Sequence, residues 1–208
     1  MPLPIRVLAV LMLATPPCAA SAQLIDRVLV VVSSEPITLS DVTAAIRFGL
    51  VPQAAGENRQ DAALEALIDR RLELVEVNRY LPPEPAAAEI DQRLADVRRR
   101  FDSTDAFDRA LLETGVTAAQ LRATVRDNLR IESYIRQRFG GSYEPPDDEV
   151  LRYYRSHESE FTRDGVLRPY SDVRPEARRR LIDQRQDTLV RNWIADLRRR
   201  ADVTLLPK

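Results

Sequence analysis

The sequence is poor in the residues that carry most covalent and metal chemistry. It has one cysteine, one histidine and six glycines among 208 residues. A single residue of each reactive kind provides no usual nucleophile–base pair and no transition-metal site. No serine stands in a Gly-x-Ser-x-Gly setting, and no glycine-rich phosphate loop is present. We therefore expect a protein that is not an enzyme, with no catalytic residues, no metal and no cofactor.

Excess charge of one sign is also missing. The chain has 31 Lys and Arg against 32 Asp and Glu, which argues against nucleic-acid binding driven by net charge. Three arginine runs, at 98–100, 178–180 and 198–200, each fall within an expected helix. Successive side chains on a helix point about 100° apart, so a run of three forms no single stripe. Solvated helix faces are the default interpretation, and attraction of acidic segments in a partner is the alternative.

Long apolar runs are confined to the first residues of the chain. Val7 to Ala14 is apolar, and Ala20-Ser21-Ala22 fits the small-x-small cleavage pattern. We expect residues 1–22 to be a signal peptide cleaved after Ala22. Cleavage would remove Cys18 and leave an exported chain with no disulfide and no integral membrane segment. Pro17 before Cys18 argues against lipidation, and an uncleaved anchor helix is the alternative interpretation.

Most of the remaining chain has the pattern of amphipathic helices. Thr38 with Asp41, and Thr117 with Gln120, form capping boxes that start helices. Gly115 has the position of a residue that ends a helix. The expected helices cover about 38–50, the apolar stripes Leu64 to Val75, Ile90 to Phe101 and Phe107 to Leu112, then 117–139, a helix from Pro146-Asp147, and 171–200. The residues 162–169 are expected to form a loop.

Two short segments read as β-structure, and they stand at opposite ends of the exported chain. Val28 to Val32 is followed by a turn and Ile37, and Val203 to Leu206 closes the chain. We expect these segments to pair, because a lone buried strand leaves its backbone groups without partners. The fold class is then mainly α with a small sheet from both ends. The expected structural core includes Val30, Leu67, Ile68, Leu189, Trp193 and Leu197.

Four segments resemble the SurA-type periplasmic chaperones. They are "IDRVLVVVSSEPITLSDV", "AALEALIDRRLELVEVNR", "DDEVLRYYRSHESEF" and the C-terminal stretch from "YSDVRPEARRRLIDQRQ" to "ADVTLL". In that family the N- and C-terminal segments fold together into a core that binds unfolded outer-membrane polypeptides, and parvulin-type prolyl isomerase domains are inserted before the final helix. The resemblance implies a periplasmic SurA-like core over 23–208, made of 24–139, a connector and helix at 140–161, and a returning helix and strand at 170–206.

The chain departs from the family plan at the place of the isomerase. Only eight residues separate Phe161 from Tyr170, and a parvulin site uses more than one histidine. The resemblance therefore implies an ATP-independent chaperone for unfolded or outer-membrane polypeptides that lacks prolyl isomerase activity. The alternative is a periplasmic adaptor or structural subunit that binds one specific folded partner.

An aromatic set around Gly140-Gly141 provides the candidate client-binding residues, since a chaperone surface needs apolar side chains that accept many sequences. These residues are Tyr134, Phe139, Tyr143, Tyr153 and Tyr154. Ordinary helix–helix core is the competing interpretation for each, and Tyr143 is expected to be the most exposed because it lies in the connector.

Two polar features have both a functional and a structural interpretation. His157 could serve as a metal ligand or general base, but we favour a histidine at a helix C-terminus, where its positive charge suits the dipole. Asp147-Asp148-Glu149 could bind a divalent cation, but acidic residues directly after Pro146 are typical of a helix N-terminus.

Overall fold

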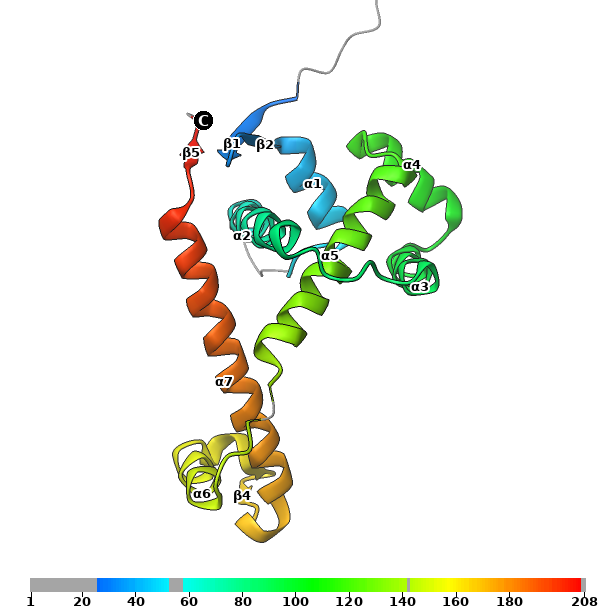
Figure 1. Ribbon diagram of the computed structural model, residues 1–208. Helices are drawn as coiled ribbons and strands as arrows, with labels where there is room; N and C mark the ends of the chain where they lie inside the picture. The colour runs from blue at the N-terminus through cyan, green and yellow to red at the C-terminus, as the bar shows by residue number, and fades with distance from the viewer. Residues whose placement is uncertain (1–25, 53–57, 142, 207–208) are drawn as a thin grey trace, which may run out of the picture.

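The computed structural model describes residues 26–52, 58–141 and 143–206. The expected signal peptide, its cleavage site and Cys18 lie outside the described residues. Figure 1 shows a broad upper lobe and a small lower lobe, joined by one long helix that returns the chain to its first strand.

The upper lobe is built from helices α1 to α5, a small sheet and the second half of α7. Its elements are β1 (Val28–Val32), β2 (Glu35–Thr38), α1 (Leu39–Phe48), α2 (Arg59–Tyr80), α3 (Ala87–Arg98), α4 (Thr104–Thr114), α5 (Ala118–Phe139) and β5 (Val203–Leu205). The lower lobe contains α6 (Asp147–Ser156), the 3-10 turn η1 (Glu158–Phe161), β3 (Thr162–Arg163), β4 (Val166–Leu167) and the first half of α7 (Tyr170–Arg200). The fold is mainly α-helical, as the sequence predicts.

The two ends of the described chain meet in one antiparallel sheet of order β2-β1-β5. Val31 lies opposite Thr204 on one side and Pro36 on the other. The pairing of β1 with β5 continues beyond the end of β5, where the Leu206 N–H donates a hydrogen bond to the Leu29 carbonyl at 3.0 Å. The pairing of the first and last strands is therefore confirmed. The side chain of Val30 in β1 is fully buried in the core under the sheet.

Local sequence signals fix the helix ends. Both expected capping boxes are present, at Thr38 with Asp41 and at Thr117 with Gln120. Gly115 ends α4 with φ of 68°, which favours glycine. Gly49 ends α1 in the same way, and a Cβ there would lie 1.7 Å from Arg100 Nη1. Arg100 donates to the Gly49 carbonyl at 2.8 Å, so the close approach ties the turn after α3 to the end of α1.

Two buried clusters form the core of the upper lobe. The first lies under the sheet and joins β1, α2, α5 and the end of α7, with Trp193 as its largest side chain. The second joins α1, α3, α4 and α5 around Phe48, Phe101 and Phe107, whose ring centroids lie 5.4 to 5.8 Å apart. Burial of these aromatic rings stabilises this part of the lobe.

The lower lobe has a third cluster of its own. Val150, Tyr153, Tyr154, Phe161, Val173, Ala177 and Leu181 are buried together. Val173, Ala177 and Leu181 follow one another at intervals of four on α7, which is the face that packs against α6.

Helix α7 therefore changes partners along its length, and this corrects the expected stripe on that helix. Its first half packs against α6, while Trp193 and Leu197 lie on the core of the upper lobe. Leu189 was expected in the core but is 46% exposed, because it lies between the two packed stretches. Val75 of α2 was also expected on a packed face and is 39% exposed. The expected core residues Val30, Ile68, Trp193 and Leu197 are buried, and Leu67 packs partly buried against them.

One expected loop contains regular structure. Thr162 pairs with Leu167, and Arg163 with Val166, in a short hairpin. Asp164 and Gly165 both have positive φ, of 53° and 78°, as a tight two-residue hairpin turn requires. This hairpin connects η1 to α7.

Candidate functional site

The aromatic residues proposed to contact clients fall into three separate environments. Tyr134 and Phe139 lie where α5 meets α7, which we call the waist. Their ring centroids are 5.7 Å and 5.5 Å from that of Trp193. Tyr134 is buried and Phe139 is partly buried, so both mainly hold α7 against α5.

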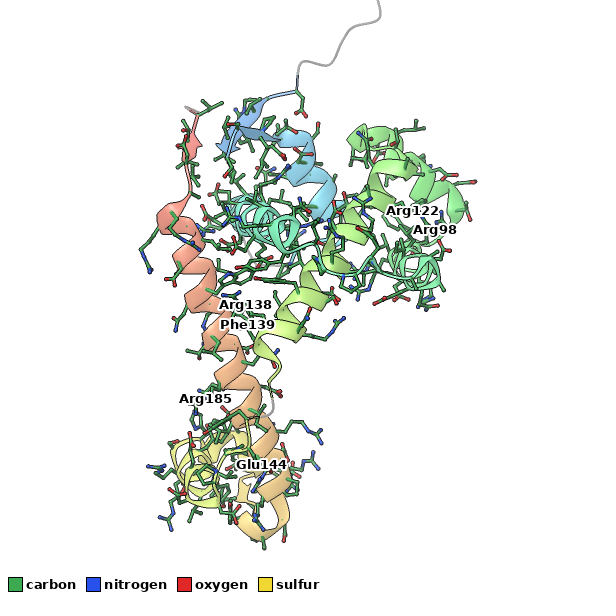
Figure 2. The ribbon with its side chains drawn as sticks, in the orientation of Figure 1. Arg98, Arg122, Arg138, Phe139, Glu144 and Arg185 are labelled. Atoms are coloured by element: carbon green, nitrogen blue, oxygen red, sulfur yellow. The ribbon has the colours of Figure 1, made fainter. Side chains whose placement is uncertain are left out.

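Arg138 covers the waist from outside. Figure 2 shows Arg138 and Phe139 at the end of α5 that faces α7. The Arg138 guanidinium lies within 6.0 Å of the ring centroids of Tyr80, Tyr134 and Phe139, and Nη1 donates to the Tyr134 hydroxyl at 3.0 Å. Tyr80, Pro82, Tyr134, Gln137 and Arg138 line a shallow hollow of about 280 Å³.

Tyr143 holds the connector between the lobes. Its hydroxyl donates to Glu149 of α6, and this hydrogen bond raises the pKa of Tyr143. The Arg185 guanidinium of α7 lies 4.0 Å from its ring centroid. Tyr143 is half-buried and joins both helices of the lower lobe.

Tyr153 and Tyr154 are buried, and their rings pack in the core of the lower lobe. The Tyr154 hydroxyl donates to the Arg168 carbonyl at 2.6 Å, and the Tyr153 hydroxyl to Glu160 at 3.1 Å. Both rings pack against Phe161. A buried aromatic residue with a satisfied hydroxyl is typical of core packing.

The structural interpretations of the polar features agree with the structure. His157 is the residue that ends α6, and its ring stacks on Tyr153 at 4.1 Å. Asp147 begins α6. Hydrogen bonds from Arg174, and also from Arg178, lower the pKa of Asp147. Within the described part of the chain, no group of three His, Cys, Asp or Glu residues is arranged to hold a metal ion.

The arginine runs divide between ion pairs and exposed positions. Arg178 pairs with Glu144 and Asp147, each at 2.6 Å. Arg198 pairs with Glu65 and Asp69 of α2, which fastens the end of α7 to the upper lobe. Arg99 and Arg199 pair with acidic residues one turn away on their own helices. The runs therefore do not form a common basic surface.

A cavity of about 340 Å³ lies between α1, α2 and α5 in the upper lobe. Each helix contributes residues at spacings of three, four and seven, which is one helix face. The lining residues are Asp41, Ala44, Ala45 and Phe48 of α1; Leu67, Arg70, Arg71 and Leu74 of α2; Gln120, Leu121, Ala123, Thr124 and Asp127 of α5; and Ile37, Leu50 and Val116 nearby. Small side chains on α1 and α5 face larger ones on α2, so the three helices leave space between them.

The charged residues of this cavity differ in their partners. Asp41 accepts hydrogen bonds from the Thr38 backbone and hydroxyl. Asp127 accepts from Arg126 at 2.8 Å, and Arg71 pairs with Glu35 of β2. Arg70 donates one hydrogen bond, from Nη2 to the Thr124 carbonyl at 2.8 Å. No carboxylate of the described residues lies within 4.0 Å of the Arg70 guanidinium.

Burial shifts the pKa values of two neighbouring residues of α2, Arg70 and Glu73. Burial lowers the pKa of Arg70, although Asp127 and Glu73 act in the opposite direction. Burial also raises the pKa of Glu73 to about 7, and the charge of Asp69 adds to this effect. Glu73 therefore holds a proton at pH values where an exposed glutamate is fully ionised.

The sequence alone did not reveal this cavity. The expected apolar stripe of α2 runs from Leu64 to Val75 and gives Arg70 and Arg71 no role. The signal that could have found it is the placement of Arg70 and Arg71 between Leu67 and Leu74, at three, four and seven residues on one helix face. Nothing in the sequence indicates that the small residues of α1 and α5 lie opposite this face of α2.

Comparison with known proteins gives a likeness among solved structures. No protein-family model matches the chain, and no curated protein matches it. Among solved structures, the chain is similar to one from Campylobacter jejuni, from work on the virulence factor PEB4 and the periplasmic protein Cj1289, two structurally related SurA-like chaperones. The match covers 88% of this chain and 100% of that chain, with a TM-score of 0.56 and 14% identity. The fold is that of the SurA-like chaperones.

The SurA-like fold of this chain places the α1–α2–α5 cavity in the lobe that both chain ends build. Among its described residues, no helix combines the length and the apolar character needed to cross a membrane. The short hairpin β3–β4 lies between Phe161 and Tyr170. This is the place where the SurA-type family has its inserted isomerase domain, and the eight residues between Phe161 and Tyr170 led us to expect none in this chain.

Proposed function

We propose that the protein is an ATP-independent chaperone of the periplasm that binds unfolded or outer-membrane polypeptides and has no prolyl isomerase activity. The observation that carries this proposal is the likeness in fold to SurA-like chaperones over the whole length of the solved chain. Fold alone does not fix function, so the binding surface must be argued from this chain's own residues.

Exposed apolar side chains of the upper lobe support the proposal. Leu112 is 81% exposed beside a hollow of about 430 Å³ at the α4–α5 corner. Tyr80 and Leu81 are 56% and 76% exposed at the waist, next to the hollow that Tyr134 lines. Several separate apolar positions allow weak contacts with many sequences, and a chaperone needs weak contacts in order to release its client.

The candidate contact residues are reordered by their exposure. Phe139 and Tyr143 are partly accessible and remain candidates, and Tyr134 contributes through the wall of the waist hollow. Leu112 and Tyr80 join them as exposed apolar positions. Tyr153 and Tyr154 serve the core of the lower lobe.

The direct test is the aggregation of a urea-unfolded outer-membrane β-barrel protein after dilution, with and without the purified protein. We expect dose-dependent suppression of light scattering near stoichiometric amounts, and none from an inert control protein. Suppression that is absent at every ratio would refute the chaperone proposal. It would favour an adaptor, whose mark is tight binding to one folded partner.

The isomerase part of the proposal has its own measurement. The rate of cis-to-trans conversion in a proline-containing reporter peptide should equal the uncatalysed rate at all protein concentrations. An established parvulin provides the positive control. A rate that rises in proportion to protein concentration would contradict this part and leave the chaperone part standing.

A further inference from the structure

Arg70 stands out among the charged groups that line the α1–α2–α5 cavity. Of the donors on its guanidinium, one N–H reaches the Thr124 carbonyl at 2.8 Å, and no carboxylate of the described residues lies at ion-pair distance. The other charged residues of the cavity, Asp41, Arg71 and Asp127, all have polar or charged partners. The charges of Asp127 and Glu73 act on this guanidinium from beyond ion-pair distance, but burial outweighs them and lowers the pKa of Arg70. An anion in direct contact would therefore stabilise the charged form of Arg70.

Apart from Gln120 and the charged residues, the cavity wall is apolar or small. The hydrophobic surface of the wall comes from Phe48, Leu67, Leu74 and Leu121. Ala123 and Thr124 have small side chains, which occupy little of the space. A volume of about 340 Å³ is near the lower end of the range for ligand sites. The site therefore fits a small group that carries both an anion and an apolar side chain.

We propose that this cavity binds the C-terminal residue of a client polypeptide, with the chain-terminal carboxylate on Arg70 and an apolar last side chain against Phe48, Leu67 and Leu121. This inference rests on the proposed chaperone function and deepens it by naming the part of the client that is recognised. An arginine holds a carboxylate through two parallel N–H···O bonds, which gives direction as well as strength.

A chain end fits this site better than an internal acidic residue. At the end of a polypeptide, one residue carries a carboxylate and an apolar side chain on the same Cα. An internal Asp or Glu carries the carboxylate on its side chain and has no apolar group of its own. The close placement of Arg70 and the leucines around one small cavity matches the first arrangement.

The neighbouring hollow provides a place for the residues that precede the client's terminus. Val116 lines both the cavity and the hollow of about 430 Å³ at the α4–α5 corner. The rest of its apolar surface comes from Leu111, Leu112, Gly115 and Ala118. A client segment in the hollow would therefore reach the cavity past Val116.

The first experiment measures binding of short fluorescent peptides by anisotropy, with the label on the N-terminus. Three peptides of otherwise identical sequence are compared: one ends in leucine with a free carboxylate, one in leucine amide, and one is an amide with a glutamate next to its last residue. We expect the free acid to bind at least about tenfold more tightly than either amide, the range of a charge-assisted hydrogen bond. Equal affinity of the acid and the glutamate peptide would overturn the choice of a chain end.

Variants identify the residue responsible. In Arg70→Gln we expect the acid and the simple amide to bind equally, while Arg59→Gln, an exposed arginine change on the same helix, should keep the preference. Ala123→Phe, at an exposed position on the cavity wall, should weaken the acid without disturbing the fold. Leu112→Asp in the hollow should weaken both peptides by the same factor. A preference that survives Arg70→Gln in a folded variant overturns the proposal.

The outcomes also distinguish failure of the carboxylate site from failure of the proposed chaperone function. If wild type suppresses barrel aggregation but binds acid and amide equally, the carboxylate site is wrong and the chaperone proposal stands. If it neither suppresses aggregation nor binds any peptide, the chaperone proposal itself fails. Should Arg70→Gln not fold, as judged by circular dichroism, the peptide comparison on wild type and the Ala123→Phe variant still decide the matter.

Discussion

In the lower lobe, Tyr153 and Tyr154 bury their rings and both of their hydroxyls are hydrogen-bonded. In the upper lobe, Arg70 borders a cavity of about 340 Å³ with a single hydrogen bond. The lower lobe thus uses its aromatic residues to complete a small core, whereas the upper lobe leaves polar and apolar groups facing open space. Under the proposed function, we expect client binding in the upper lobe and a structural role for the lower lobe.

The segments that join the lobes also pack separately against each lobe. Helix α7 carries a buried face for each lobe, and Leu189 between them is half exposed. Tyr143 and the pair of Arg178 with Glu144 fasten the connector to the lower lobe. Each lobe therefore has packing contacts of its own, and mutations can test the lobes separately.

The largest expected effect is at the waist. Trp193→Ala should lower the free energy of unfolding by about 3–5 kcal/mol, because it leaves a cavity beside Tyr134 and Phe139. The measurement is urea denaturation followed by circular dichroism. Leu189→Ala on the same helix is the matched control and should change stability by less than about 0.5 kcal/mol. An unchanged midpoint for Trp193→Ala would show that the upper core does not depend on this ring.

A core substitution in the lower lobe should act locally. Phe161→Ala should lower the local stability by about 3–4 kcal/mol, since the ring is 2% exposed and contacts both buried tyrosines. In hydrogen exchange, amides of α6 should lose protection while those of β1 and α2 keep it. Val166→Ala in the exposed hairpin serves as the control. Equal loss of protection in both lobes would break the proposed division.

The same variant sharpens the functional side of the comparison. If binding belongs to the upper lobe, Phe161→Ala should suppress barrel aggregation as well as the wild type at a temperature where the upper lobe is folded. Loss of suppression under these conditions would place client contacts in the lower lobe.

The partly buried Glu73 of the upper lobe predicts that stability depends on pH. The pKa of Glu73 is about 7 in the folded protein, against 4.5 in the unfolded chain. Between these values the folded state keeps a proton that the unfolded state has lost, so this residue's contribution to stability falls as pH rises. Glu73→Gln should remove that fall, with little difference from wild type near pH 4 and a gain of at most about 3 kcal/mol at pH 8.

Urea denaturation at the two pH values measures this effect. Glu89→Gln, an exposed change on α3, controls for the loss of one negative charge. A gain of equal size at both pH values would show that titration of Glu73 is not its cause.

The smallest expected effect concerns helix capping. The Thr117 side chain accepts from the Gln120 N–H at 3.2 Å at the start of α5, so Thr117→Ala should cost about 1 kcal/mol. In the lower lobe α6 has no side-chain cap, because Pro146 occupies that position. Thr188→Ala, whose exposed hydroxyl donates to the Gln184 carbonyl, is the control and should have little effect on the melting temperature.

Local chemistry made much of the fold predictable. The capping boxes at Thr38 and Thr117, and the glycine after α4, are signals that act within four residues, and the helices begin and end there. The pairing of the terminal strands followed from the need of Val28–Val32 for a hydrogen-bonding partner and the lack of another β-like segment. These inferences needed no knowledge of which helices touch.

Predictions that depended on distant contacts were less successful. The spacing of Leu189 from Trp193 suggested one continuous buried stripe, but α7 packs against a different lobe at each end and leaves Leu189 exposed. The aromatic cluster of the sequence is divided among the waist, the connector and the lower core. The pattern of a helix gives the face that is apolar, and only the partner decides which part of that face is covered.

By itself the sequence determined most of the secondary structure, although not the β3–β4 hairpin, and it determined the closure of the sheet by the first and last strands and the scarcity of residues for covalent chemistry. Only the tertiary structure decided that small side chains of α1 and α5 face Leu67, Arg70 and Leu74 of α2. It also decided that none of the carboxylates in the described part of the chain lies within 4.0 Å of the Arg70 guanidinium. The physical reason is range. Capping and backbone pairing are set by neighbours or by obligatory hydrogen bonds, whereas a cavity is a property of three helices that meet from distant parts of the chain.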